Sequence, residues 1–250
     1  MVLNQNWFQF QTLKAVEALS LEDFIVNHMN AESPVVVSGM MSDWPCFSCP
    51  ERKWTTDYIR KIAGLRTVPV EIGARYTDSG WTQKLMTVGE FIDGFVLARG
   101  DGPKGYLAQH NLLDQVKELR EDIEVPEYCY AGDSDIDDID INGWFGPQGT
   151  VSPLHTDPKH NFLCQVAGKK YVRLYRRDQT ECLYPFDDEL LFNTSRVDLE
   201  NPDLASHPKF AEAEGFECIL EEGQMLYIPP KCWHFVKSLA PSFSLSFWFQ

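Results

Sequence analysis

The C-terminal part of the chain consists of short apolar segments separated by turns. From about Asn142 onward these segments have the alternation of half-buried strands. Between Ser242 and Phe249, for example, Phe243, Leu245 and Phe247 fall on one face of an extended strand. Repeated short antiparallel strands are typical of a jelly-roll or cupin-like barrel. A chain of 250 residues is long enough to bury the core of one such barrel.

Two pairs of these segments are expected to form β-hairpins. Residues 161–166 and 169–175 are separated only by a turn at Ala167-Gly168. Residues 217–220 and 225–228 flank a second turn, which contains Gly223. Because tight glycine turns commonly join antiparallel neighbours, each pair is interpreted as a hairpin.

The N-terminal part has a mixed pattern. Apolar residues recur at helical spacing in 21–30, and a capping-box sequence opens a predicted helix over 87–98. Short β-branched runs at 34–37 and 68–72 indicate strands. The expected fold class is therefore mainly β with flanking helices, as in a double-stranded β-helix.

The whole chain, 1–250, is expected to form a single domain. Residues 1–140 would be its mixed α/β flanking part, and 141–250 its barrel core. Proline and acidic residues are frequent in 176–216, which indicates an insertion between two barrel strands.

The composition limits the partners. Lys and Arg total 22 against 37 Asp and Glu, so the formal net charge is −15. An acidic protein gains no affinity from counterion release at nucleic acids, so direct nucleic-acid binding is not expected. A basic protein or peptide, in contrast, is an electrostatically favourable partner. There is no pattern of a signal peptide or a membrane span, and seven dispersed cysteines suit reduced thiols. We expect an intracellular protein of the nucleus, the cytoplasm or both, without membrane association; the sequence indicates no oligomeric state.

Three residues form a candidate metal site. His155 and Asp157 are two positions apart, so on an extended strand their side chains would project to the same face. His234 follows a proline turn after a predicted strand and is the candidate third ligand. Two imidazoles and one carboxylate on one face of a metal leave coordination positions open, as Fe(II) oxygenases require for a cosubstrate and O2. The His-x-Asp pair by itself is a weak signal, because most histidines are surface or core residues.

Lys170 is a candidate anion anchor. It begins a predicted strand in which Val172 and Leu174 occupy the same face, so its side chain is expected to point inward, where a lysine needs an anionic partner. A solvent-exposed edge position, like that of Lys169, is the alternative. Additional hydrogen bonds could come from a set of polar side chains, each equally compatible with a structural role: Tyr106, Ser152 and Asn161.

With these residues in view, the chain resembles the JmjC-domain oxygenases, and within that family the subgroup that includes arginyl hydroxylases. The resemblance extends over nearly the whole chain. It is carried by these stretches: Arg75-Tyr76-Thr77-Asp78, Gly105-Tyr106-Leu107-Ala108-Gln109-His110, Trp144-Phe145-Gly146-Pro147-Gln148-Gly149-Thr150, Ser152-Pro153-Leu154-His155-Thr156-Asp157-Pro158, Asn161-Phe162-Leu163, Asn193-Thr194-Ser195, Asn201-Pro202-Asp203-Leu204, Ile228-Pro229, Trp233-His234 and Ser244-Leu245-Ser246-Phe247-Trp248.

The resemblance implies a set of site residues and cofactors. Fe(II) would be held by His155, Asp157 and His234, with 2-oxoglutarate as cosubstrate and O2 as oxidant. The residues implied for 2-oxoglutarate are Tyr106, Ser152, Asn161 and Lys170. Those implied for the substrate are Glu71, Tyr76, Trp81, Gln109, Trp144 and Trp248. A carboxylate among aromatic rings suits a guanidinium, so C-hydroxylation of an arginine in a protein is the main expectation.

Three other functions remain open at this point. Demethylation of N-methyl-lysine in histones would use the same iron chemistry, and an aromatic cluster could also hold a methylammonium. A non-catalytic cupin-like binding module would keep the barrel without the chemistry. A zinc hydrolase is the third alternative, but no HExxH motif accompanies the three ligands.

Overall fold

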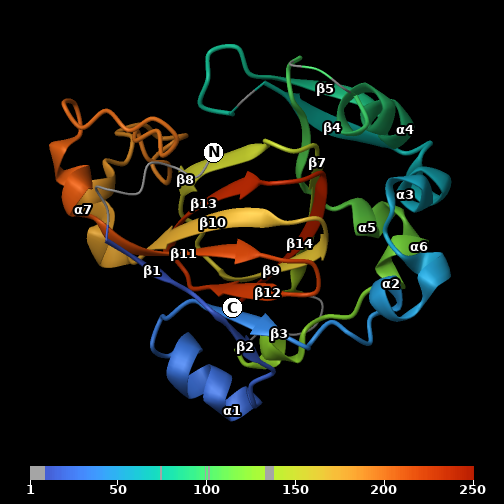
Figure 1. Ribbon diagram of the computed structural model, residues 1–250, viewed down its shortest axis with the longest axis horizontal. Coiled ribbons are helices and arrows are strands. Elements are labelled where there is room, and N and C mark those ends of the chain that lie inside the picture. Colours follow the sequence, from blue (N-terminus) through green and yellow to red (C-terminus); the bar gives the residue numbers. More distant parts are fainter. Residues whose placement is uncertain (1–8, 74, 99, 101, 133–137) are drawn as a thin grey trace.

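Two facing β-sheets form the centre of the protein (Figure 1). The computed structural model describes residues 9–73, 75–98, 100, 102–132 and 138–250. The smaller sheet has five strands in the order β1 (Gln9–Thr12), β11 (Glu214–Leu220), β10 (Lys170–Tyr175), β13 (Trp233–Ser238) and β8 (Val151–His155).

The larger sheet has nine strands and extends beyond the smaller one. Their order is β2 (Ala15–Glu17), β3 (Val35–Ser38), β12 (Met225–Ile228), β9 (His160–Ala167), β14 (Ser242–Phe249), β7 (Asp140–Gly146), β6 (Gly105–His110), β4 (Thr67–Ile72) and β5 (Thr82–Thr87). The expected mainly β fold with flanking helices is thus confirmed.

Short helical segments flank the sheets. On the N-terminal side they are α1 (Leu21–Phe24), η2 (Ile25–Met29), α2 (Pro45–Ser48), η3 (Pro50–Arg52), α3 (Thr56–Ala63), α4 (Val88–Phe91), η4 (Ile92–Val96), α5 (Leu112–Gln115), α6 (Lys117–Arg120) and η5 (Glu127–Tyr130). The predicted helix over 87–98 appears as α4 and η4, and Thr87 and Glu90 form the capping box that begins it. The predicted helix at 21–30 appears as α1 followed by η2.

Both predicted hairpins are wrong. Strand β9 pairs with β12 and β14 in the larger sheet, whereas β10 pairs with β11 and β13 in the smaller one. In the same way, β11 and β12 belong to opposite sheets. The glycine turns therefore carry the chain from one sheet to the other instead of reversing it within a sheet. This crossing is what builds a double-stranded β-helix.

The apolar core is divided among three layers. One cluster lies between the sheets and includes Val172 and Leu174 of β10 and Leu226 of β12. A second packs the N-terminal helices against the outer face of the larger sheet, where Phe243, Leu245 and Phe247 project as predicted. A third packs the segment between β10 and β11 against the smaller sheet, and this segment contains η7 (Arg177–Gln179), α7 (Thr180–Leu183) and η8 (Pro208–Glu212).

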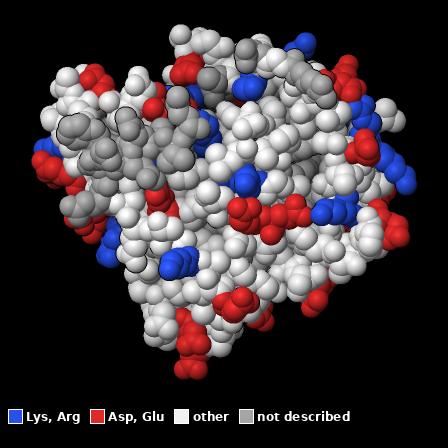
Figure 2. All heavy atoms as spheres, viewed as in Figure 1, with Lys and Arg blue, Asp and Glu red and all other residues white. Residues whose placement is uncertain are grey.

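The surface carries charges of both signs. Figure 2 shows Lys and Arg side chains on this face as separate groups among Asp and Glu, without a continuous basic area. Of the helices that the structure describes, none has the length and apolarity to cross a membrane.

Candidate active site

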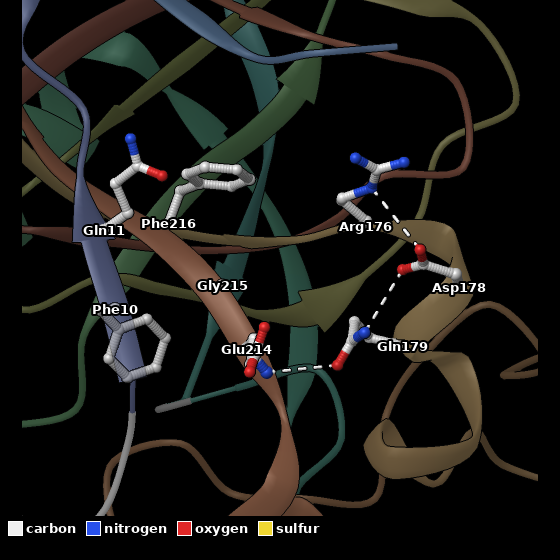
Figure 3. Close-up of a pocket in the computed structure, with 8 residues that line it drawn as sticks. All are labelled: Phe10, Gln11, Arg176, Asp178, Gln179, Glu214, Gly215 and Phe216. Carbon is white, nitrogen blue, oxygen red and sulfur yellow. Dashed lines mark hydrogen bonds and ion pairs between the residues drawn. The ribbon is translucent and has the colours of Figure 1, made fainter. Parts of the chain in front are cut away.

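A wide surface hollow of about 580 Å³ lies away from the predicted ligands, between β1, β11 and the turn at 176–179 (Figure 3). Several of its polar groups are paired with one another. Arg176 Nε lies 3.6 Å from Asp178 Oδ2, and the Glu214 backbone N–H donates to Gln179 Oε1 at 3.2 Å. None of the predicted site residues is among the described residues that line it. The hollow therefore has no part in the predicted chemistry.

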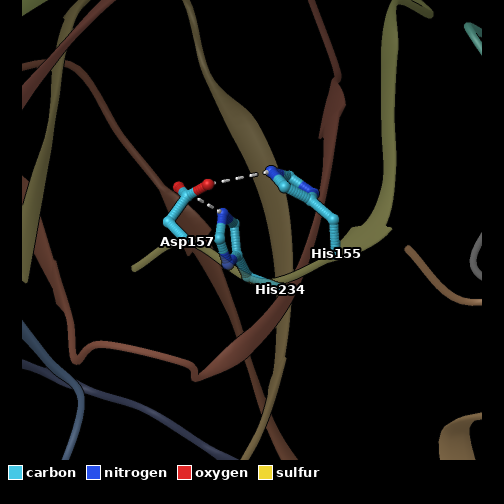
Figure 4. Close-up of side chains that lie close together, drawn as sticks. All are labelled: His155, Asp157 and His234. Atoms are coloured by element: carbon cyan, nitrogen blue, oxygen red, sulfur yellow. Dashed lines mark ion pairs between the residues drawn. The ribbon is translucent and has the colours of Figure 1, made fainter. Parts of the chain in front are cut away.

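The predicted metal ligands meet at the open end of the barrel. Strands β8 and β13 are antiparallel neighbours, and His155 and His234 are directly opposite each other in their register. The sequence predicted Asp157 on the same strand as His155, but β8 ends at His155. The carboxylate comes instead from the turn that follows, yet it still projects towards both imidazoles (Figure 4).

The three side chains are close enough to share one ion. Asp157 Oδ1 lies 3.9 Å from His155 Nε2, and Asp157 Oδ2 lies 3.4 Å from His234 Nε2. The candidate ligand atoms all lie within 4.8 Å of one another. Distances of this size fit a metal with ligands at about 2.0–2.2 Å. In the part of the chain that the structure describes, this is the single cluster of His, Cys, Asp and Glu side chains with such spacing.

Backbone carbonyls fix the orientation of both imidazoles. The Nδ1 of His155 is 2.7 Å from the Pro153 carbonyl oxygen, and that of His234 is 3.0 Å from the Cys232 carbonyl oxygen. An Nδ1–H that donates to a carbonyl leaves the Nε2 lone pair free for a metal. Both rings therefore present Nε2 to the carboxylate.

Burial prepares these groups for a cation. Burial, together with the nearby His234, lowers the pKa of His155 to about 4, so this imidazole is neutral at pH 7. Burial also acts to lower the pKa of His234, but the hydrogen bond and charge of Asp157 outweigh it and raise that pKa. The Asp157 carboxyl has a lowered pKa because its partnership with His234 outweighs burial. A divalent cation could take the place of the proton that this pair shares.

A narrow inner pocket joins the triad to the residues predicted for 2-oxoglutarate. It is lined by Tyr106, Ser152, Asn161 and Lys170 together with all three candidate ligands. These four side chains are all buried and come from β6, β8, β9 and β10, which belong to both sheets. The structure therefore brings the predicted cosubstrate residues together with the predicted metal ligands.

Lys170 is a buried cation without an anionic partner. Its side chain points inward, as predicted, and the residue is 1% exposed. Its Nζ donates to Tyr106 Oη at 3.3 Å, and no carboxylate of the described residues forms an ion pair with it. Burial lowers its pKa to about 7. Nearby, Asn161 Oδ1 is buried and has no hydrogen-bond partner. The buried ammonium fits an anion such as a dicarboxylate, which could accept from Lys170 Nζ in place of Tyr106 and from the Asn161 amide N–H groups.

A second pocket of about 270 Å³, the outer pocket, is lined by His155 and Asp157 of the triad and opens to the surface. Four of the six residues predicted for the substrate line it: Glu71, Tyr76, Gln109 and Trp144. Burial raises the pKa of Glu71, although a hydrogen bond from the Trp81 side chain acts to lower it. A desolvated carboxylate therefore lies in the same pocket as the metal ligands, where it attracts a cation.

Two predicted substrate residues are not among the described residues that line this pocket. Trp81 contacts it only indirectly, through Glu71. Trp248 lies on β14 opposite Asn161 in the strand register, and its buried Nε1 has no hydrogen-bond partner. It is close to the inner pocket along the sheet, but it is not among the residues that line it.

Asn193 and Thr194 also belong to the site, and the sequence analysis gave them no role. The Asn193 side chain donates to the Thr156 carbonyl oxygen at 2.9 Å, and the Thr156 backbone N–H donates to the Asn193 carbonyl oxygen at 2.9 Å. Thr194 pairs with His155 as an isolated bridge, and its hydroxyl is 3.1 Å from Tyr76 Oη. The signal that could have identified them is the stretch Asn193-Thr194-Ser195, which is one of those that carry the resemblance.

Comparison with known proteins identifies relatives along most of the chain. A family model described as a cupin-like domain matches residues 21–250. "Lysine-specific demethylase 8" of Xenopus tropicalis is 52% identical over 231 residues, which are 92% of this chain and 51% of that protein. "Lysine-specific demethylase JMJ30" of Arabidopsis thaliana is 47% identical, with 96% and 56% covered. "Jumonji C domain-containing protein 5" of Drosophila melanogaster is 41% identical, with 94% and 59% covered.

The chain spans about half the length of the curated relatives it matches. The family match covers every strand from β3 onward and every residue of the candidate site described above, and only the edge strands β1 and β2 precede it. The chain therefore belongs to the cupin-like domain family, and the resemblance to its JmjC-domain members is confirmed.

Proposed function

We propose that the chain is an Fe(II)- and 2-oxoglutarate-dependent oxygenase that acts on a basic side chain of a protein. One observation carries this proposal. Two pockets meet at a His-Asp-His triad, and one contains an unpaired buried lysine while the other contains a desolvated carboxylate. The first suits an anionic cosubstrate and the second a cationic substrate.

The donor set fits Fe(II). His155, Asp157 and His234 supply two imidazoles and one carboxylate from one side, the set that non-haem Fe(II) oxygenases use. When bound, Fe(II) with 2-oxoglutarate and O2 supplies the oxidation, which leaves succinate and CO2 and transfers one oxygen atom to a C–H bond of the substrate. The protein holds the ligands and positions both organic molecules.

Lys170 would hold the distal carboxylate of 2-oxoglutarate. Binding an anion returns the ammonium to its charged form, so the lysine would be protonated in the complex although its pKa is about 7 without one. Asn161, Ser152 and Tyr106 would add hydrogen bonds from three other strands. Because the pocket is closed around Lys170, water would not compete for these groups.

Demethylation of N-methyl-lysine is the reaction that the names of the relatives favour over the arginine hydroxylation first expected. Hydroxylation of an N-methyl group gives a carbinolamine, which breaks its C–N bond to release formaldehyde and the free amine. Glu71 would pair with the ammonium, and Tyr76 and Trp144 would contact the methyl groups. A trimethylated lysine has no N–H to donate, so this carboxylate favours the mono- and dimethyl forms.

Hydroxylation of an arginine carbon is the second candidate. The observation in its favour is Glu71, which has two acceptor oxygens in a pocket with flat aromatic side chains. A guanidinium donates two parallel hydrogen bonds to such a carboxylate and stacks well on aromatic rings. The same pocket therefore suits either substrate, and the products distinguish the two reactions.

The test uses matched peptides whose central residue is arginine, monomethyl-, dimethyl- or trimethyl-lysine. Each is incubated with the Fe(II)-loaded protein, 2-oxoglutarate and O2, and succinate, formaldehyde and peptide mass are measured. Formaldehyde with loss of a methyl group supports demethylation, whereas gain of one oxygen without formaldehyde supports hydroxylation. No succinate with any peptide, from protein that binds Fe(II), contradicts the oxygenase proposal.

Glu71 provides the matched variants. Glu71→Gln should lower the affinity for whichever peptide is turned over by about tenfold or more, because a charged hydrogen bond in a desolvated pocket is lost. Glu118→Gln changes an exposed carboxylate on α6 and should leave that affinity unaltered. Equal effects of the two substitutions would argue against Glu71 as the cation-binding group.

A further inference from the structure

The turn at 187–193 places two large apolar side chains in solvent beside the outer pocket. Leu190 is 87% exposed and Phe192 is 69% exposed. Leu190 also lines the outer pocket, with Leu191 and Asn193 of the same turn. Exposed apolar groups next to a binding pocket commonly mark a contact site for a partner.

Hydrogen bonds hold this turn in position. Asp188 Oδ1 accepts from the backbone N–H groups of Leu190 and Leu191, at 2.8 and 3.2 Å. At the other end, Asn193 forms two hydrogen bonds with Thr156, which lies between two of the candidate metal ligands. The hydrogen bonds therefore fix the position of the apolar side chains relative to the candidate metal ligands. Little conformational entropy would be lost when a partner binds to them.

The charged residues that neighbour these side chains along the sequence are all acidic. Asp187, Asp188 and Glu189 precede Leu190 directly and are exposed. Between Arg177 and Arg196 the sequence contains no Lys, Arg or His. With Glu71 in the pocket itself, the surroundings favour a cationic partner that also carries an apolar side chain.

We propose that Leu190 and Phe192 form a docking surface for the substrate chain itself. The occupant is a basic protein segment that inserts its modified side chain beside Glu71 and packs a leucine-sized side chain on the turn. This inference rests on the proposed function, and it adds a specificity element that the metal site does not supply. Since an extended chain rises about 3.3 Å per residue, the apolar side chain would lie within a few positions of the modified residue.

The experiment compares peptides by their binding, measured as fluorescence anisotropy. The parent peptide has a central arginine or dimethyl-lysine with serine and lysine around it. In a scan, a single leucine replaces serine at each of the positions before and after the centre. The wild-type protein is compared with a Leu190→Ser/Phe192→Ser variant. Leu65→Ser is the matched control, because Leu65 is a 95% exposed leucine that does not line the outer pocket.

We expect leucine to tighten binding to the wild type by about tenfold at one or two positions on one side of the centre, as partial burial of such a side chain predicts. The Leu190→Ser/Phe192→Ser variant should lose most of this gain, and Leu65→Ser should keep it. A gain that persists in the double variant, or no gain at any position, overturns the docking surface. A smaller sedimentation coefficient of the double variant, without loss of the peptide gain, would assign the surface to a second copy of the chain instead.

Failure of the proposed function has a different signature. If the scan shows the leucine gain but no peptide yields succinate, the docking surface stands and the oxygenase proposal fails. If succinate forms with equal efficiency for all scanned peptides and their affinities are equal, the oxygenase proposal stands and the docking surface fails.

Discussion

Lys170 is the residue at which stability and function are most clearly opposed. A buried lysine without an anion is unfavourable, and its depressed pKa, about 7, measures that cost. An anion bound in the inner pocket would offset this desolvation cost. A binding site of this kind is less stable when empty than a simple apolar core would be.

Replacement of this lysine should separate its effect on stability from its effect on 2-oxoglutarate binding. Lys170→Met should raise the free energy of unfolding of the ligand-free protein by a few kcal/mol at pH 7, since it removes an unpaired buried charge of similar length. It should also abolish measurable 2-oxoglutarate binding by calorimetry. Lys169→Met, the exposed neighbour on the turn, is the control and should change neither quantity.

The difference in the free energy of unfolding between the wild type and Lys170→Met should depend on pH, because the pKa of Lys170 is lowered on folding. Below pH 7 the lysine is charged in both the folded and the unfolded protein, so the penalty is complete and constant. Between pH 7 and the ordinary value of 10.5, the unfolded chain keeps a proton that the folded protein has lost, so the wild type becomes more stable relative to Lys170→Met. Urea unfolding of both proteins over this range should show the difference narrowing as the pH rises. A difference that stays constant would contradict the assigned pKa.

At the level of elements, two of the turns between the sheets contain a glycine in the left-handed region. Gly168 joins β9 to β10 at φ +73°, and Gly223 joins β11 to β12 at φ +86°. A methyl group on Gly168 would lie 2.2 Å from the Pro241 carbonyl oxygen, whereas one on Gly223 would meet no atom within 4 Å. The two turns thus share a left-handed backbone conformation but differ in packing.

This difference predicts unequal effects of alanine. Gly223→Ala should lower the free energy of unfolding by about 1 kcal/mol, which is the cost of a left-handed conformation for an L-residue. Gly168→Ala should cost about 3 kcal/mol or more, because backbone must also move. Equilibrium unfolding in urea measures both. Equal losses would show that the loop at Pro241 adjusts freely.

A second inter-element feature joins the segment before β5 to the insertion. Arg75 pairs with Asp198 at 2.8 Å and with Glu200 at 2.7 Å, and Glu200 also pairs with Lys237 of β13. Tyr76, the next residue, reaches Thr194 at the metal site. Arg75 is therefore a positioning residue for one wall of the outer pocket.

Loss of this arginine should weaken binding of the substrate more than binding of the cosubstrate. Arg75→Met should raise the KM of the productive peptide severalfold and leave 2-oxoglutarate affinity unchanged, because Tyr76 lines only the outer pocket. Arg60→Met removes a comparable ion pair, to Asp93, far from the site and serves as control. Steady-state kinetics and calorimetry provide the two readouts. A matching loss of 2-oxoglutarate affinity would mean that Arg75 supports the whole site instead of one wall.

At the level of the whole molecule, the net charge of −15 should steer basic chains towards the site. The association rate of a lysine-flanked peptide should therefore fall severalfold as salt is raised through the physiological range, where screening acts over about 8 Å. A peptide with the same central residue but serine flanks should show a weaker dependence. Stopped-flow fluorescence at several NaCl concentrations tests this, and equal salt dependence of the two peptides would contradict it.

Local sequence was sufficient for the capped helix at Thr87, for the inward direction of Lys170 and for about half of the strands, because alternation and capping are properties of neighbouring residues. The strands that it predicted are β3, β4, β9, β10, β11, β12 and β14. It also singled out His155, Asp157 and His234 as candidate metal ligands, and the structure brings their ligand atoms within 4.8 Å of one another. The hairpins were predicted wrongly because Gly168 and Gly223 allow a tight turn without specifying the strand that the chain joins next.

What only the tertiary structure decided is how distant segments meet. Strand pairing is determined by long-range contacts, so the sequence could not show that His155 and His234 face each other across β8 and β13. For the same reason it gave no role to Asn193 and Thr194, which reach the site from an insertion, and it included Trp248, which lies outside both pockets as the structure describes them. Residue type determines which chemistry is available, but the crossing of the chain between two sheets determines where it is assembled.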